Sequence, residues 1–191
     1  MSARLPPFVY APSLQEYMVS AKEFFTRHPQ YHMLVSGAVI FNREGKMLLV
    51  QRAKEEKAFP NFWEIPGGKV DDTDETILHA VVREVKEETG LQVTRIVRKV
   101  AEFGWDEPSQ AWWKLIFEVQ VESLDNVVLD PIEHQAYVFA TEQEIVEEQV
   151  AGGPALSWVS PPNKDVKLAA FRLRREAGEG PDTSMKAKEV V

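Results

Sequence analysis

Three glutamates in one short segment have a spacing that could bind a metal. Glu84, Glu87 and Glu88 are related as i, i+3 and i+4, so on an α-helix they fall within one arc of roughly 100°. Carboxylates this close repel one another unless cations offset their charge. Their oxygens suit hard ions such as magnesium, which also bind phosphate oxygens. The cluster predicts metal-assisted phosphate chemistry, whereas the same triplet taken alone is also typical of a solvated acidic helix face.

The segment around these glutamates is predicted to form a helix from Glu75 to Thr89, which Gly90 ends at the position after the last turn. The arc beside the glutamates is apolar and can pack on a sheet; it consists of Ile77, Leu78, Val81, Val82 and Val85. Gly67 and Gly68 precede the helix. Because glycine has no Cβ, these residues allow the backbone to approach a metal or a phosphate closely.

The same stretch resembles the Nudix hydrolase signature. Glu75 is followed by seven residues and then by Arg83-Glu84-Val85-Lys86-Glu87-Glu88-Thr89-Gly90-Leu91, which matches each specified position. The preceding Trp63–Val70 also resembles the family's lead-in. One departure is that six residues separate Gly68 from Glu75, where the family pattern has five. The register of the intervening aspartates is therefore open.

The resemblance implies a fold, a cofactor and roles for these residues. The fold is an α/β/α sandwich with a mixed sheet over roughly residues 31–150, and the cofactor is magnesium, for which manganese can substitute. Glu84, Glu87, Glu88 and a backbone carbonyl at Gly68 would be metal ligands. Arg83 and Glu75 would form an internal ion pair. The general base is either Glu133 or Glu87, while His134 is expected to be structural.

The resemblance implies hydrolysis of a phosphoanhydride, most similar to the branch that acts on nucleoside triphosphates, including oxidised ones, and releases pyrophosphate. Arg52, Phe62 and Lys69 are the candidate substrate contacts. Further aromatic residues could line a base-stacking pocket: Phe59, Trp63, Trp112 and Trp113. ADP-ribose, dinucleoside polyphosphates, capped RNA and diphosphoinositol phosphates are alternative substrates. A catalytically inactive nucleotide-sensing module is the competing class, and the intact glutamate cluster argues against it.

The elements that must position these residues are predicted to lie in three parts of the chain. These are an N-terminal extension with a helix (1–30), a hydrolase domain (31–177) and a flexible tail (178–191). Helices are predicted at 13–27, 141–150 and 161–175, outside the glutamate helix. A hairpin is predicted from strands 33–41 and 46–51 around Asn42–Gly45. Further strands are expected at 93–103, 112–121 and 136–139. The extra terminal helices leave a homodimer open.

Composition excludes several classes of function. The net charge is −8, from 22 basic and 30 acidic residues, which argues against binding of extended nucleic acid. This charge is compatible with a small anionic substrate only if metal cations mediate the contact, and the small nucleotide-type substrate is what the resemblance implies. The absence of cysteine excludes a disulfide scaffold and a thiolate nucleophile. We find no secretory signal and no apolar run of about 20 residues, so we expect a cytoplasmic protein without a membrane span; a nuclear location remains open.

Overall fold

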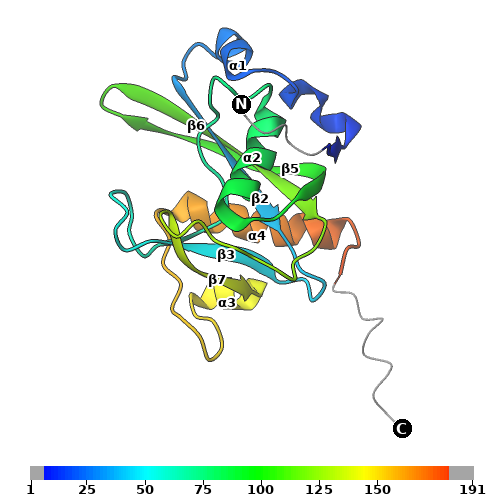
Figure 1. The fold of residues 1–191 in the computed structure, drawn as a ribbon, viewed down its shortest axis with the longest axis vertical. Helices are drawn as coiled ribbons and strands as arrows, with labels where there is room; N and C mark the ends of the chain where they lie inside the picture. The colour runs from blue at the N-terminus through cyan, green and yellow to red at the C-terminus, as the bar shows by residue number, and fades with distance from the viewer. Residues whose placement is uncertain (1–6, 181–191) are drawn as a thin grey trace.

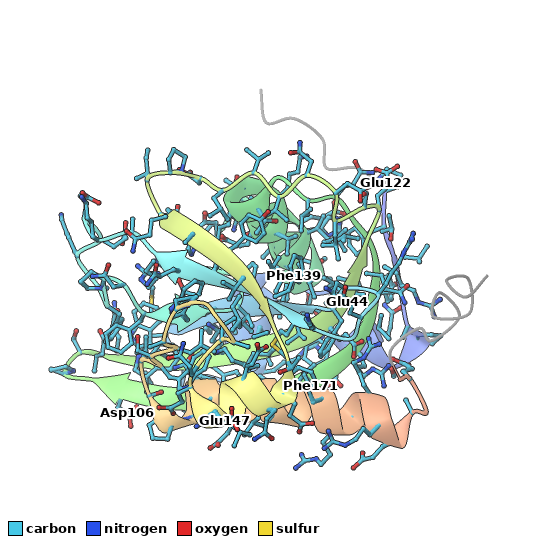
Figure 2. All side chains as sticks on the ribbon, turned by 90° about the horizontal axis from the view of Figure 1, so that it is seen from below. Glu44, Asp106, Glu122, Phe139, Glu147 and Phe171 are labelled. Atoms are coloured by element: carbon cyan, nitrogen blue, oxygen red, sulfur yellow. The ribbon has the colours of Figure 1, made fainter. Side chains whose placement is uncertain are left out.

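The computed structural model describes residues 7–180; the predicted tail 178–191 lies mostly outside these residues. The helix that carries the glutamates covers one side of the sheets, and the long C-terminal helix covers the other side (Figures 1 and 2). The α/β class and the mixed sheet with flanking helices are thereby confirmed. Within residues 7–180, no helix combines the length and the apolar character needed to cross a bilayer.

The helices are the 3-10 helix η1 (Pro12–Tyr17), α1 (Ala21–Arg27), α2 (Ile77–Thr89), α3 (Glu142–Glu147) and α4 (Pro161–Glu176). The strands are β1 (Val9–Tyr10), β2 (Met33–Ile40), β3 (Met47–Arg52), β4 (Trp63–Glu64), β5 (Val93–Glu107), β6 (Gln110–Val121) and β7 (His134–Ala140).

The strands form two sheets. The four-stranded sheet has the order β1-β5-β6-β2 and is mixed, because β1 pairs with β5 in parallel, β5 with β6 antiparallel, and β6 with β2 in parallel. The three-stranded sheet has the order β4-β3-β7 and is antiparallel. The predicted hairpin of β2 and β3 was therefore wrong. Only Phe41 and Met47 pair across the turn, and the two strands then diverge into different sheets.

Helix α2 has the amphipathic character that its sequence predicts. The Thr76 side chain accepts a hydrogen bond from the His79 amide and caps the helix, which therefore begins two residues after the predicted start at Glu75. Gly90 ends it with a left-handed backbone, φ 69°. The predicted apolar arc is buried in full: Ile77, Leu78, Val81, Val82 and Val85. This burial fixes the rotation of α2 and hence the direction of its glutamates.

The other helices agree in part with the predictions. The predicted helix 13–27 is divided into η1 and α1, because Ser20 caps a new helix and the Val19 carbonyl accepts a hydrogen bond from the Ile77 amide. The capping box of Thr141 and Glu144 is present, although α3 ends before the predicted 150. Helix α4 packs its Phe171 ring edge-on to Phe41, 5.0 Å between centroids, and so faces the sheets (Figure 2).

Candidate active site

The glycine pair is held beside the edge of β2. The Ser36 amide donates to the Gly68 carbonyl at 2.8 Å, and the Ala38 amide donates to the Pro66 carbonyl at 2.8 Å. Gly67 has φ 145°, and a Cβ there would stand 2.2 Å from the Ser36 carbonyl oxygen. Only glycine fits this conformation and this approach. The backbone pairing therefore fixes the loop against the sheet, next to α2.

Glu84 and Glu88 point at this loop. A Cβ on Gly68 would stand 2.7 Å from both carboxylate oxygens of Glu84, and the Gly67 amide donates to Glu88 Oε2 at 2.8 Å. Both glutamates are buried. Burial, with repulsion from neighbouring carboxylates, raises the pKa of Glu84 to about 7 and that of Glu88 to about 8. Two carboxylates concealed from water are thus brought together in an environment that favours a compensating cation.

Glu87 differs from these two because its side chain is 58% exposed. Arg83 connects it to Glu84: the same Nη1 atom lies 2.8 Å from a carboxylate oxygen of each. The three predicted metal-binding side chains therefore share one end of α2. One of them reaches solvent, where a substrate can approach.

The predicted ion pair of Arg83 with Glu75 was wrong. Arg83 is paired with Asp74 instead, through Nε to Oδ1 at 2.8 Å and Nη2 to Oδ2 at 2.9 Å. The Glu75 side chain is 82% exposed and lies 3.7 Å from His79. The reason lies in the register of the loop, since five residues separate Gly68 from Asp74 and Asp74 turns inward to accept a hydrogen bond from the Asp71 amide.

The loop before β7 brings Glu133 to the glutamates. The Asp130 amide donates to the Glu88 carbonyl, and the Ala53 amide donates to the Glu133 carbonyl at 2.8 Å. Ligand atoms of Glu88, Glu133 and His134 all lie within 4.8 Å of one another. Glu133 is exposed, whereas His134 is buried. The structure therefore places a fourth carboxylate, the predicted candidate base, beside the cluster.

A group of charged residues that contact one another behind the glutamates was not predicted. Glu64 on β4 accepts from Arg52 Nη1 at 2.8 Å and lies 3.2 Å from His134 Nε2. Burial works to raise the pKa of Glu64, but the hydrogen bond from His134 and the charges of Lys114 and Arg52 together lower it. His134 in turn has a raised pKa: burial opposes the charged form, but the hydrogen bond to Glu64 and the charge of Glu88 outweigh it. Glu64 lies within the Trp63–Val70 lead-in, which was the one signal in the sequence for it.

The three predicted substrate contacts have different surroundings. The Arg52 guanidinium is held by Glu64, by Glu56 at 2.8 Å and by the Ala58 carbonyl at 2.8 Å. Phe62 is half-buried with its ring 6.2 Å from that of Phe59, edge to face. Lys69 is exposed, and its carbonyl accepts a hydrogen bond from Arg83. Arg52 thus has internal partners that explain its position without a ligand.

Two of the aromatic candidates, Trp112 and Trp113, lie on opposite faces of β6. Trp112 stacks on Trp105 of β5, with 5.4 Å between ring centroids. Trp113 points the other way and stacks on Tyr31 at 4.5 Å. It lines a cavity of about 400 Å³ between α1 and the sheet, away from the glutamates. Trp63 is buried in the core, and its indole N–H donates a hydrogen bond to the Ala155 carbonyl.

Comparison with known proteins identifies the domain. Residues 31–158 match the model of the NUDIX domain. The CTP pyrophosphohydrolase of Escherichia coli is 34% identical over 116 residues, which is 60% of this chain and 80% of that protein. An uncharacterized Nudix hydrolase of Listeria monocytogenes is 29% identical over 92 residues, or 48% of this chain, and the match spans 54% of the Listeria protein's length.

The fold is also found among solved structures. The MutT protein of Methanosarcina mazei Go1 superposes with a TM-score of 0.60 at 24% identity, covering 77% of this chain and 97% of that chain. At this identity the likeness concerns the fold. It agrees with the arrangement of two sheets between helices described above.

Proposed function

Because this chain belongs to the NUDIX hydrolase family, we propose that it hydrolyses a phosphoanhydride bond of a nucleoside triphosphate, normal or oxidised, with magnesium and releases pyrophosphate. The observation that carries the proposal is the convergence of Glu84 and Glu88, both buried, on the Gly67–Gly68 backbone. The name of the E. coli relative, a CTP pyrophosphohydrolase, supports the substrate class.

The residues at this place fit a divalent cation. Glu84, Glu87 and Glu88 supply carboxylate oxygens, the ligands that magnesium prefers. A cation would favour the ionised forms of Glu84 and Glu88, whose pKa values burial has raised to about 7 and 8. A bound magnesium would polarise the phosphoryl oxygens and stabilise the negative charge that develops on them.

The chain's own groups have separable tasks. Water attacks phosphorus as the anhydride P–O bond breaks, and pyrophosphate leaves with the bonding electrons. A carboxylate must accept the proton of that water, and Glu133 is our assignment, with Glu87 as the alternative. Arg83 orients Glu84 and Glu87 from one guanidinium nitrogen. Its pair with Asp74 holds that nitrogen in place.

The test is pyrophosphate and phosphate release by the full chain, with magnesium and with EDTA. The panel consists of nucleoside triphosphates, oxidised nucleotides, ADP-ribose and dinucleoside polyphosphates. We expect magnesium-dependent release of pyrophosphate from a triphosphate. Glu147→Gln serves as the control for glutamate-to-glutamine variants of the site. Glu147 is exposed on α3 and hydrogen-bonds only Gln143 among the described residues.

The outcomes separate the alternatives. Preferred cleavage of ADP-ribose or of a dinucleoside polyphosphate would keep the chemistry and replace the substrate. Thermal stabilisation by nucleotides without turnover would instead indicate a sensing module. Full activity in EDTA would remove the metal from the proposal.

A further inference from the structure

The N-terminal segment with η1 and α1 encloses a cavity against the four-stranded sheet. This segment precedes residues 31–158, the part of the chain that matches the NUDIX domain. It is blue in Figure 1 and packs into the same apolar cluster as α2. A cavity of about 400 Å³ remains between it and the sheet, and none of the candidate metal ligands lines this cavity. The volume is within the range of about 300–1,000 Å³ that small-molecule sites occupy.

Four aromatic rings that line the cavity follow one another in space. The centroids of Phe24 and His28 lie 4.4 Å apart, those of His28 and Tyr31 lie 6.4 Å apart, and Tyr31 stacks on Trp113 at 4.5 Å. Trp113 in turn lies across Gly104, where a Cβ would stand 2.7 Å from its Cε3. The rings are therefore held by one another and by the sheet. A surface of this kind suits contact with the planar ring of a ligand.

Two cations also line the cavity, Arg27 from α1 and Lys99 from β5. Arg27 donates from Nη2 to Glu23 at 2.6 Å, and Lys99 Nζ lies 3.3 Å from a carboxylate oxygen of Glu102. A guanidinium has five N–H donors and an ammonium has three, so each cation keeps donors for a further acceptor. Their side chains are 52% and 34% exposed, so an anionic group can reach them. Both kinds of cation bind phosphate oxygens.

The walls of the cavity are fixed by the rest of the domain. Val19 lines the cavity, and its carbonyl accepts a hydrogen bond from the Ile77 amide at the start of α2, at 2.9 Å. After α1, the His32 amide donates to the Ala111 carbonyl at 2.8 Å, and the Ala111 amide donates to His32 Nδ1 at 3.0 Å. These bonds attach both ends of α1 to the domain. A cavity with fixed walls binds a ligand at a smaller cost in conformational entropy.

We propose that this cavity is a second ligand site, separate from the glutamates, and that it binds a nucleoside monophosphate. The base lies against the aromatic rings, and the phosphate contacts Arg27 and Lys99. Glu16 and Glu102 line the same cavity and balance the charge of the two cations. One phosphate is therefore accommodated, whereas the additional negative charge of a triphosphate is repelled. This site goes beyond the proposed function and does not depend on hydrolysis.

Calorimetric binding to the full chain in EDTA tests this site. The probes are AMP, GMP, CMP and UMP, each compared with its own nucleoside and its own triphosphate. Without metal the carboxylates of the candidate active site repel a phosphate, so binding in EDTA reports on the cavity. We expect at least one monophosphate to bind with a Kd roughly 10-fold lower than that of its nucleoside, because the phosphate adds charge-assisted hydrogen bonds. Its triphosphate should bind more weakly than the monophosphate.

Two variants separate the phosphate contacts from the rest of the site. Arg27→Gln and Lys99→Gln should each raise the Kd of the monophosphate roughly 10-fold and leave that of the nucleoside unchanged, since the nucleoside carries no phosphate. Lys22→Gln is the matched control, because it removes the same charge from an exposed residue of α1 that does not line the cavity. Glu88→Gln alters the candidate active site and should also leave this Kd unchanged.

The inference is overturned if none of the four monophosphates binds in EDTA at millimolar concentration, or if monophosphate and nucleoside bind equally well. A Kd that stays the same in both Arg27→Gln and Lys99→Gln would also overturn it. Loss of binding in Glu88→Gln would place the monophosphate at the glutamates instead. Absence of magnesium-dependent turnover, with the monophosphate still bound in EDTA, would refute the proposed function and leave this second site standing.

Discussion

The guanidinium of Arg83 is bound in two places by the carboxylate of Asp74, at 2.8 and 2.9 Å, and not by that of Glu75 next to it in the chain. Asp74 is buried in this pair, whereas the Glu75 side chain is 82% exposed. The Asp74 carboxylate raises the pKa of Arg83 and so keeps the guanidinium charged. The residue that positions Arg83 is therefore one place earlier than the family pattern alone indicates.

Asp74→Asn should lower activity roughly 10–100-fold, because it loosens the residue that orients Glu84 and Glu87. It should also lower the free energy of unfolding by about 2 kcal/mol, because a charged hydrogen-bond acceptor becomes neutral. Steady-state kinetics and urea denaturation measure both effects. Glu75→Gln is the matched control and should change neither by much; an equal loss of activity in that variant would contradict this assignment.

Metal binding should be visible in the stability of the protein without any substrate. Magnesium should raise the Tm of the wild type, because the ion binds the folded state and offsets repulsion among buried carboxylates. Glu88→Gln should abolish most of this rise while the protein remains folded in EDTA, since its buried carboxyl has a pKa raised to about 8 and tolerates a neutral substitute. Thermal denaturation with magnesium and with EDTA is the measurement. A rise in Tm as large as that of the wild type would show that Glu88 is not a ligand.

Local patterns were sufficient to predict α2 and its glutamates. The 3.6-residue period predicts the buried arc, and Gly90 predicts the end of the helix. The same reasoning failed for β2 and β3, because both strands are buried on both faces and show no alternation that would assign them to one sheet. It also joined η1 to α1, because the hydrogen bond from Ile77 to Val19 that separates them is made by a residue far along the chain.

The contact between Glu64 and His134 behind the glutamates could not be predicted for a related reason. Glu64 and His134 come from β4 and β7, which the register of β3 brings together, whereas Lys114 comes from β6 in the other sheet. Each residue alone is an ordinary charged residue in a strand-like segment. The glutamate cluster, by contrast, is contained within one helix, where spacing along the chain determines proximity in space.

Lys167 should make the stability of the protein depend on alkaline pH. Burial lowers its pKa to about 7, whereas an unfolded lysine titrates near about 10.4. Between these values the unfolded chain holds a proton that the folded chain has released, so the free energy of unfolding should rise with pH. Lys167→Met should therefore be more stable than the wild type at pH 7, by on the order of 2–4 kcal/mol, and this advantage should shrink toward pH 10.

Urea denaturation of both proteins between pH 7 and pH 10 measures this trend. Lys164→Met is the control on the same helix, because Lys164 is paired with Glu148 at 2.7 Å and its side chain is partly exposed. That variant should show no comparable convergence with the wild type. A constant difference between Lys167→Met and the wild type across the range would contradict a depressed pKa for Lys167.

Glu133→Gln should separate the proton acceptor from the metal ligands. If Glu133 takes the proton of the attacking water, its loss should lower kcat by about 10²–10⁴-fold, while KM changes little and the magnesium-dependent rise in Tm is kept. Glu87→Gln should lower both activity and that rise in Tm, because Glu87 is assigned to the metal. Glu122→Gln serves as the control, because Glu122 is exposed and directly follows β6. If Glu133→Gln retains its kcat and Glu87→Gln loses activity with its magnesium response intact, then Glu87 is the base, and Glu133 lies beside the cluster without accepting the proton.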